Sequence, residues 1–400
     1  MHQRSDQERL LIVGASILQL PAIIKAKEQG YYVGVVDYNP NAIGIQYADE
    51  YFNVSTIDEE GVTEVACGFK PNGIITLATD MPMRAIAAAN AACGLSGISY
   101  ETAIKATDKA AMIQAFEINN VDHPWFFIIE NKKQLYEIKN QLLFPCVIKP
   151  TDNAGSRGVA LAHNYEELKE EYNYSFNESR SGKVIVEEYL EGPEFSVEVM
   201  VVNNEPHILQ ITDKITTGAP HFVEMGHSQP SMQPIANQKK ICALAKKACK
   251  AIGITCGPAH VEMIYTKAGP KMVELGARMG GDCITTHLVP LSTGIDMIGA
   301  TIDVACGKKP ILERQYSKGS AIRYFDSKKG VLKSIDGLNK AKKVPGVRDI
   351  ILAKEAGDVL TDIGSSGDRV GFVIAQANTP EDAIIVCEKA LKQIRICIET

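Results

Sequence analysis

The chain has 400 residues, of which 45% are hydrophobic and 22% are charged, and its formal net charge is −6. This length predicts about two or three domains, each long enough to bury its own core. The mildly acidic balance, without a long basic run, argues against nucleic acid or an anionic membrane as the main partner, so any anionic ligand must be held by a local cluster of donors.

The ten cysteines are scattered, and none of them forms a C-x-x-C pair. This usage is typical of a reducing compartment and argues against a disulfide framework or a zinc site. The N-terminal residues are polar and charged, and no segment approaches the roughly 20 apolar residues of a membrane span. We therefore expect a cytoplasmic protein without a membrane partner.

Strand and helix patterns alternate along the N-terminal quarter of the chain. Buried-strand runs at 10–16 and 31–40 flank a helix pattern at 18–30, and this alternation predicts a parallel sheet with helices on both faces. Gly14 follows the first strand and Asp37 ends the second, but the G-x-G-x-x-G fingerprint is absent. The two residues are therefore read as parts of the fold, and an NAD(P)-dependent oxidoreductase is a hypothesis that rests on this domain alone.

Two lysines stand at the edges of predicted elements. Lys109 lies in the first turn of a helix predicted at 106–120, with Thr107 as the expected N-cap. A lysine in this position opposes the helix dipole, so it is either solvated or reaches across to an anion. Lys149 ends a strand predicted at 145–150.

The loop at 151–158 that follows this strand is small, polar and glycine-containing, as in a loop that holds phosphate. The common phosphate loop instead places its lysine after the glycines, at the start of a helix. Farther along, residues 184–202 read as two strands joined by a tight turn at 191–193. The lysine-first order therefore indicates a different kind of phosphate site.

The segment 257–282 reads as a β-hairpin that carries two glutamates. In a symmetric hairpin, Glu262 faces Glu274 and Tyr265 faces Lys271. Residues that are directly opposed have Cβ atoms roughly 5 Å apart and point to the same side of the sheet. We therefore expect the two carboxylates to lie together.

Two carboxylates this close must share a proton or a cation. A shared proton would suit acid–base chemistry, and a shared cation would suit Mg²⁺, which takes oxygen ligands and leaves positions for nucleotide phosphates. Arg278 follows in a glycine-rich stretch and suits a phosphate oxygen better than a structural pair. The alternative is a pair of exposed glutamates on a solvated sheet face.

Four further residues are candidates for substrate contacts. Glu224 and His227 lie in a long polar loop predicted at 216–231, which either binds an amine or forms a lid with solvated histidines. His260 should share a strand face with the metal-binding glutamates, as a neighbour of the metal, a wall of the acceptor site or a structural histidine. Asp282 either orients the nearby arginine or meets a substrate ammonium.

The order of these features closely resembles the ATP-grasp superfamily of carboxylate–amine ligases. The shared features are two spaced lysines, a glycine loop after a strand, a Glu-Glu strand and a Glu/Glu/Arg hairpin, and the specific motifs lie within 105–300. The resemblance covers most of the chain and implies a mixed α/β and α+β fold. The implied units are a Rossmann-like pre-ATP-grasp domain at 1–105, a two-lobed ATP-grasp domain at 106–305 with lobes at about 106–183 and 184–305, and a small C-terminal α+β domain at 306–400.

The resemblance also implies that ATP and Mg²⁺ or Mn²⁺ bind between the lobes, with the loop 152–158 folded over the phosphates. At the nucleotide it implies Lys109 and Lys149 on the phosphates, Gly155, Ser156 and Gly158 as backbone donors, Glu187, Glu188, Tyr189 and Leu190 around adenine, and Glu194 on the ribose. At the reacting centre it implies Glu262 and Glu274 as metal ligands and Arg278 and Lys149 as catalytic cations. Glu224, His227, His260 and Asp282 are the implied substrate residues.

One position departs from the family pattern. Many members read E-x-N-x-R, whereas this chain reads E-L-G-A-R and has Gly276 at the position of the asparagine, a further metal ligand. A second metal would then depend on Glu274 alone or on water. The E-L-G-A-R form resembles the L-amino acid ligases and proteins named as phosphoribosylglycinamide synthetases.

The resemblance implies an ATP-dependent ligase that forms an acylphosphate and then an amide. Its substrates would be a small carboxylic acid, such as an amino acid, and an amine, and the enzyme would be a homodimer, as is common among such ligases. Three alternatives stay open: a phosphoribosylglycinamide synthetase or formyltransferase of purine synthesis, a biotin carboxylase, and a non-catalytic ATP-binding sensor. The absence of a second tight Lys/Arg cluster in the sequence weighs against the first of these.

Overall fold

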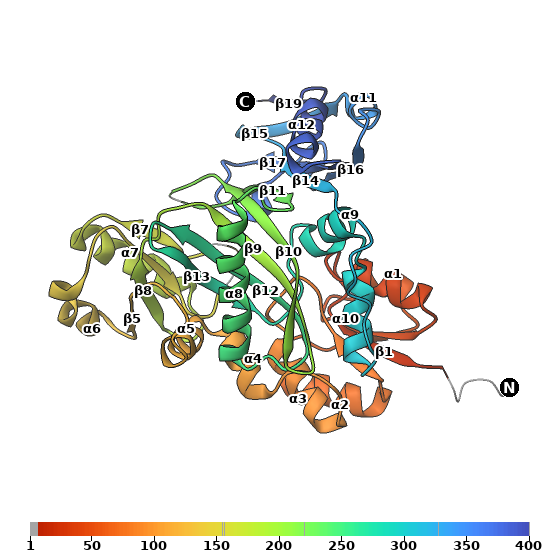
Figure 1. Ribbon diagram of the computed structural model, residues 1–400, viewed down its shortest axis with the longest axis horizontal. Helices are drawn as coiled ribbons and strands as arrows, with labels where there is room; N and C mark the ends of the chain where they lie inside the picture. Colours follow the sequence, from red (N-terminus) through yellow and green to blue (C-terminus); the bar gives the residue numbers. More distant parts are fainter. Residues whose placement is uncertain (1–6, 154, 156, 220, 327, 400) are drawn as a thin grey trace.

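The computed structural model describes residues 7–153, 155, 157–219, 221–326 and 328–399, and four β-sheets organise this part of the chain (Figure 1). The large central sheet lies in the middle of the molecule, with the N-terminal part on one side and a small lobe on the other. The C-terminal part lies at one end of the central sheet (Figure 1).

The N-terminal sheet is parallel, with strand order β3-β2-β1-β4. Its strands are β1 (Arg9–Val13), β2 (Tyr32–Val36), β3 (Glu50–Phe52) and β4 (Gly73–Ile75). Because successive side chains of a strand point to opposite faces, Leu11 and Val13 pack with helices α2 (Glu59–Phe69) and α3 (Met83–Cys93). Leu10 and Ile12 pack with α1 (Leu20–Glu28) and α10 (Met297–Ala305). The prediction of a parallel sheet covered on both faces is confirmed.

An antiparallel sheet of order β5-β8-β6-β7 forms the small lobe. Its strands are β5 (Phe126–Ile129), β6 (Cys146–Pro150), β7 (Ala160–Ala162) and β8 (Val184–Glu188), with helices α6 (Lys132–Glu137) and α7 (Tyr165–Glu178). Helix α7 packs on the sheet through Leu168 and Tyr172. The two strands predicted within 184–202 therefore do not pair, because β8 joins this lobe and the next strand joins the central sheet.

The central sheet is antiparallel and has eight strands in the order β13-β12-β9-β10-β11-β14-β18-β16. Its strands are β9 (Glu194–Val202), β10 (Glu205–Thr216), β11 (Glu224–Gln229), β12 (Gly257–Thr266), β13 (Gly269–Gly276), β14 (Gly319–Tyr324), β16 (Val347–Leu352) and β18 (Gly371–Ala377). Helix α8 (Ile235–Ile252) covers one face through Ile241, Leu244 and Ala248. The sheet runs across the domain boundary expected at 305/306, because β11 pairs with β14.

A three-stranded sheet of order β17-β15-β19 completes the C-terminal part. Its strands are β15 (Gly330–Asp336), β17 (Val359–Leu360) and β19 (Arg395–Glu399), and the remaining helices are α9 (Val289–Thr293), α11 (Leu338–Ala341) and α12 (Pro380–Leu391). The helix predicted at 380–396 ends at Leu391, because the chain turns there into β19.

The helix predicted at 106–120 is broken at Asp108, which has an extended backbone (φ −129°). Helix α4 (Tyr100–Thr107) ends before it and α5 (Lys109–Ile118) begins after it. The Asp108 side chain accepts a hydrogen bond from the backbone N–H of Ala111 at 2.8 Å, so Asp108, and not Thr107, is the N-cap. The backbone N–H of Lys109 donates to the carbonyl of Thr151 at 2.7 Å, which places Lys109 beside the glycine loop.

Among the described residues, no single helix has the length and hydropathy needed to cross a membrane, and one pair of segments bent by 113°, Ile284–Thr293 and Met297–Ala305, meets the criterion by length and composition.

Candidate active site

Two adjoining cavities lie along the edge of the central sheet. The larger cavity, of about 520 Å³, is lined by residues from the N-terminal part, the small lobe, the central sheet and the C-terminal part. The smaller cavity, of about 170 Å³, lies between the small lobe and the central sheet. Lys109, Glu224, Glu262 and Glu274 line both cavities, and a ligand in one cavity would therefore adjoin a ligand in the other.

The hairpin glutamates stand at the shared wall. Glu262 on β12 pairs with Glu274 on β13, as predicted. The predicted pairing of Tyr265 with Lys271 is wrong. The turn is one residue shorter than in the symmetric hairpin, and Tyr265 therefore pairs with Pro270. A β-bulge at Val273 inserts one unpaired residue between the turn and Glu274, and this residue restores the opposition of the two glutamates.

The bulge also separates the two faces of the hairpin. Met272 and Glu274 are two residues apart and would share a face in a regular strand. With the extra residue, Met272 pairs with Met263 and both belong to the same buried cluster, while Glu274 pairs with Glu262 and lines both cavities. Met272 also lines the smaller cavity. The bulge therefore sets the opposition of the two carboxylates.

Each glutamate has its own cation instead of a shared one. Lys109 Nζ lies 2.9 Å from Glu274 Oε1 and also donates to the carbonyl of Asn153 at 2.8 Å. Glu262 contacts Lys214 Nζ at 3.4 Å and His260 Nε2 at 2.9 Å. Burial alone would lower the pKa of Lys109, but the charge and hydrogen bond of Glu274 outweigh it and hold this pKa above its ordinary value. Each carboxylate thus has a protein cation beside it, and the sharing of one cation between the two stays a prediction.

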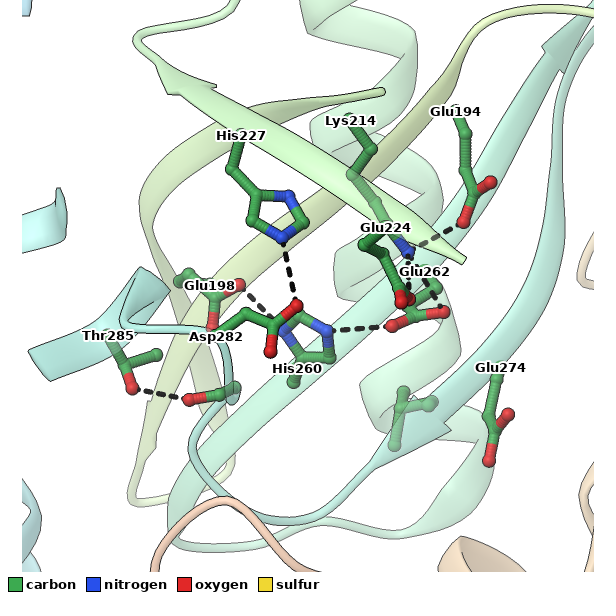
Figure 2. Close-up of polar contacts among 12 residues, drawn as sticks. Glu194, Glu198, Lys214, Glu224, His227, His260, Glu262, Glu274, Asp282 and Thr285 are labelled. Atoms are coloured by element: carbon green, nitrogen blue, oxygen red, sulfur yellow. Dashed lines mark hydrogen bonds and ion pairs between the residues drawn. The ribbon is translucent and has the colours of Figure 1, made fainter. Parts of the chain in front are cut away.

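Lys214, on β10, is the centre of the largest charge cluster of the site (Figure 2). Its side chain is 2% exposed, and its Nζ lies 2.6 Å from Glu194, 3.4 Å from Glu262 and 3.6 Å from Glu224. Burial would lower the pKa of Lys214, but these three carboxylates raise it well above its ordinary value, so the lysine stays charged. Sequence reasoning missed this residue, because a single lysine in a strand carries no spacing signal.

His260 joins a fully buried carboxylate to the hairpin that carries Glu262 and Glu274. Its Nδ1 lies 2.7 Å from Glu198 Oε1, and its Nε2 faces Glu262, so His260 and Glu262 share a face as predicted (Figure 2). Burial would lower the pKa of His260, but Glu198 and Glu262 raise it to about 9. The second oxygen of Glu198 has no hydrogen-bond partner among the described residues. Glu198 was also missed from the sequence.

Arg278 is held by an aspartate of the N-terminal part. Its Nε and Nη2 donate to the two carboxylate oxygens of Asp80 at 2.9 and 2.8 Å, and this two-point contact fixes the plane of the guanidinium. Gly276 makes the contact possible, because a Cβ at this position would lie 2.6 Å from Asp80 Oδ1 and 3.0 Å from Arg278 Cζ. The departure from E-x-N-x-R therefore has a structural cause.

Asp282 does not orient Arg278. It binds Arg369 of the C-terminal part at 2.8 Å through both oxygens, and it faces His227 Nε2 at 3.3 Å. Arg369 also donates to the carbonyl of Glu224 at 3.1 Å and lies 3.8 Å from the ring centre of Tyr324. One arginine from outside the predicted motifs thus fixes the surroundings of Glu224, His227 and Asp282.

Two of these substrate candidates, Glu224 and His227, lie in a strand and not in a loop. Residues 224–229 form strand β11, which pairs with β10 and β14, so a strand interrupts the predicted loop at 216–231. Glu224, His227, His260 and Asp282 all line the larger cavity. His221, in the irregular part, is exposed and does not line either cavity.

The smaller cavity brings together the residues expected at a nucleotide. Lys149 lies 2.6 Å from Glu187, with both side chains buried, and Glu188 lies 2.6 Å from Lys271. The lining of this cavity includes Lys149, Gly155, Glu187, Glu188, Tyr189, Leu190 and Glu194. The N–H of Gly158 donates instead to the hydroxyl of Tyr174 at 3.3 Å, and Gly158 lines neither cavity. Ser156 lies outside the described residues.

The Gly276→Ala substitution should displace Asp80 from Arg278, since the added methyl group would occupy the position of the carboxylate. Breaking a buried ion pair in this way costs about 3 kcal/mol. We expect a clearly lower midpoint of thermal unfolding, measured by calorimetry. Gly281→Ala is the matched control, because the nearest atom to its added Cβ is 3.8 Å away. An equal loss in both variants would contradict the role of Gly276.

The raised pKa of His260 predicts a pH-dependent stability in the protein without added divalent cations. The folded protein holds this proton more tightly than the unfolded chain, so the stabilisation is complete below about pH 6.5. It is lost as the pH rises through the folded pKa of about 9. The free energy of unfolding should therefore fall by up to about 1.4 kcal/mol per pH unit in this window, as measured by denaturant titration.

Glu198→Gln is the informative variant for this measurement, because it removes the negative charge 2.7 Å from His260 Nδ1 but keeps an acceptor oxygen. The slope of unfolding free energy against pH should then be shallower than in the parent protein. The assignment fails if the two slopes are the same.

Comparison with known proteins identifies two parts of the chain. Residues 142–286 match the ATP-grasp domain, and residues 323–399 match the L-amino acid ligase C-terminal domain 2. An uncharacterized protein, y4rH, of Sinorhizobium fredii is 28% identical over 75% of this chain and 63% of that protein. The L-arginine-specific L-amino acid ligase of Bacillus subtilis is 23% identical over 68% of this chain and 67% of that protein. The chain thus spans about two thirds of the length of these relatives.

Two solved structures are similar over nearly the whole chain. The phosphoribosylglycinamide synthetase from Anaerococcus prevotii is 26% identical, has a TM-score of 0.80 and covers 98% of this chain and 100% of that one. The L-amino acid ligase from Bacillus licheniformis is 21% identical, has a TM-score of 0.85 and covers 99% of this chain and 100% of that one. The expected mixed α/β fold is confirmed, and the chain contains an ATP-grasp domain at 142–286 and a segment at 323–399 that matches the L-amino acid ligase C-terminal domain 2.

Proposed function

We propose that this protein is an ATP-dependent ligase that joins a small carboxylic acid, an amino acid, to an amine and releases ADP and phosphate. The observation that carries the proposal is the wall shared by the two cavities. Lys109, Glu262 and Glu274 face both spaces, so a phosphoryl group of a nucleotide in the smaller cavity would adjoin a carboxylate in the larger one. The match to the L-amino acid ligase C-terminal domain supports an amino acid as the acid.

In this proposal the smaller cavity holds ATP. Glu187, the backbone near Glu188 and Tyr189, and Leu190 would contact adenine, and Glu194 would accept from the ribose hydroxyls. Lys109 and Lys149 would lie on the phosphates, below the loop 152–158. Both lysines already lie beside carboxylates, and exchange of these partners for phosphate oxygens would keep their charges neutralised.

The hairpin glutamates fit Mg²⁺ or Mn²⁺. Mg²⁺ is commonly bound by one or two carboxylates, with water and substrate phosphates completing its shell, and Glu262 and Glu274 are directly opposed. Among the described residues, no group of three or more Asp, Glu, His or Cys side chains is arranged to hold a metal without such help. The ion would supply charge neutralisation to the phosphates, and Gly276 offers no third ligand.

The proposed chemistry has two steps. A carboxylate oxygen of the acid attacks the γ-phosphorus of ATP, and the bond from that phosphorus to the ADP oxygen breaks. The amine nitrogen then attacks the acyl carbon, the bond from this carbon to the phosphate oxygen breaks, and the amine proton leaves. Arg278, fixed by Asp80, would stabilise the charge on the transferring phosphoryl group. The loop 152–158 would keep water from the acylphosphate.

The amine would enter beside the C-terminal part. Glu224, His227 and Asp282 line the larger cavity there and would hold an ammonium group, with His260 behind the reacting centre. We further propose that the partners are small-molecule substrates and that the protein assembles as a homodimer. We also propose that the chain divides into parts at 1–105, 106–305 and 306–400. The pairing of β8 with β5 and β6 moves the limit between the two lobes to the end of β8.

A ligase acting on a phosphoribosyl amine is the second candidate. The whole-length similarity to the phosphoribosylglycinamide synthetase structure favours it. It shares the ATP site and the acylphosphate step with the first candidate and differs in the amine, and in the formyltransferase form also in the acid, which is then formate.

Phosphate release with Mg-ATP and pooled amino acids, with products identified by mass spectrometry, tests the proposal. We expect ADP together with a product of dipeptide mass, whereas turnover only with phosphoribosylamine and glycine or with formate would select the second candidate. Glu274→Gln should reduce Mg²⁺-dependent turnover by more than about 100-fold, since it removes a metal ligand. Glu101→Gln, at an exposed helix pair, is the control. Full turnover in the Glu274 variant would refute the metal assignment.

Arg369→Lys should weaken the amine side of the site, because lysine cannot contact both oxygens of Asp282 and the carbonyl of Glu224 together. The KM for the amine should rise by about tenfold, equivalent to about 1.4 kcal/mol. Trapping of the acylphosphate by hydroxylamine should continue at the parental rate, because this small nucleophile does not need the amine site. Arg348→Lys, in the same part of the chain and outside both cavities, is the control. Loss of both reactions together would show a general structural role for Arg369.

A further inference from the structure

The larger cavity extends past the reacting centre toward the N-terminal helices. Some of the cationic side chains that line it have a carboxylate partner, and others do not. Lys109, Lys214 and Arg278 each lie within 4 Å of a carboxylate. Arg84 and Arg180 line the same cavity, yet within the described ranges neither has an ion-pair partner. At the end lined by the N-terminal helices, where Asp80 is paired with Arg278, the guanidinium groups of Arg84 and Arg180 thus lack a carboxylate partner among the described residues.

Arg84 is held in place by a neutral group. It lies in the first turn of α3, and its Nε donates to the hydroxyl of Thr107 at 2.8 Å. The same hydroxyl donates to the carbonyl of Ala103 at 2.8 Å, so the contact joins α3 to α4. Within the described part of the chain, this bond occupies only Nε, and the two terminal nitrogens of Arg84 have no protein acceptor. They are the pair of donors that a guanidinium offers to a carboxylate or phosphate.

Arg180 lines the same end of the cavity, but it belongs to the small lobe. It follows α7 in the small lobe, and its Nη1 lies 2.9 Å from the sulfur of Met81, three positions before Arg84. A thioether is a weak acceptor and leaves the charge of the guanidinium uncompensated. The two arginines therefore lie on opposite sides of one opening, one on the N-terminal part and one on the small lobe.

Two carboxylates also line this end of the cavity, but each has donors of its own. Glu59 accepts from the hydroxyl of Tyr100 at 3.0 Å. Asp152 accepts from Ser179 Oγ and from the backbone N–H groups of Arg180 and Ser181, at 3.1, 3.1 and 2.6 Å. Neither carboxylate lies within 4 Å of a guanidinium of Arg84 or Arg180.

We propose that a substrate of this enzyme carries a second anionic group, a carboxylate or a phosphate, remote from the reacting carbon, and that Arg84 and Arg180 bind it. This inference rests on the proposed ligase function and specifies its substrate class. Planar guanidinium groups bind such oxyanions through paired N–H donors, and two of them favour a dianion over a neutral tail. The bound anion would connect the N-terminal part to the small lobe and thereby narrow the opening of the cavity.

The test compares charged ligands with neutral counterparts of similar size. L-glutamate is compared with L-glutamine and O-phospho-L-serine with L-serine, both as substrates and by calorimetric binding to the protein loaded with Mg-ADP. Inorganic phosphate serves as the simplest anionic probe. In the parent protein the charged member of at least one pair should bind about tenfold more tightly than the neutral one. The pair that shows the preference distinguishes a carboxylate from a phosphate.

Arg84→Gln and Arg180→Gln should remove this preference and leave the affinity for neutral ligands and for ADP unchanged, and Arg84→Lys should retain part of it. Lys183→Gln, at an exposed pair with Glu130 near Arg180, is the control. The inference is overturned if no anionic probe binds more tightly than its neutral counterpart, or if the arginine variants weaken both alike. Loss of anion binding in the variants of a protein that shows no turnover would support the anion site and reject the ligase proposal.

Discussion

The opposition of Glu262 and Glu274 is the constraint on which the rest of the site depends. Two carboxylates on paired strands repel each other unless cations neutralise them. The structure supplies Lys109 to one and Lys214 with His260 to the other. Lys109 comes from the start of α5 and Lys214 from β10, so the pair is stable only when these elements are packed together. A divalent cation bound between the carboxylates would add to a charge balance that the protein already maintains.

Ion pairs also join the site on the central sheet to the parts on either side of it. Asp80 of the N-terminal part fixes Arg278, and Arg369 of the C-terminal part fixes Asp282. Both contacts pair a planar guanidinium with two carboxylate oxygens, which sets orientation as well as distance. The site is therefore built at a junction, where the N-terminal part orients Arg278 and the C-terminal part supplies the arginine that orients Asp282.

Hydrophobic periodicity and local spacing predicted the parallel N-terminal sheet and the opposition of the glutamates, because both features leave a local pattern in the sequence. The clustering of Lys109, Lys149 and the residues 187–190 was instead implied by the resemblance to the ATP-grasp ligases. Sequence reasoning did not find Asp80, Glu198, Lys214 or Arg369. Their partners lie 10 to 198 positions away, from the contact of Lys214 with Glu224 to that of Asp80 with Arg278. It also placed Tyr265 opposite Lys271, because the residue pattern does not fix the length of the turn. The expected N-cap failed for a related reason, since Thr107 and Asp108 are both good caps and only packing selects between them.

The strand pairing of β11 with β14 has a consequence for how such proteins diverge. Glu224 and His227 lie on β11, and the neighbouring strand belongs to the C-terminal part, as does Arg369. An exchange of residues 306–400 between relatives would bring a new strand partner and a new arginine against an unchanged β11 and Asp282. A change in the proposed amine side of the site would therefore involve both segments, whereas the small lobe, which supplies Lys149 and Glu187 to the smaller cavity, forms a sheet of its own.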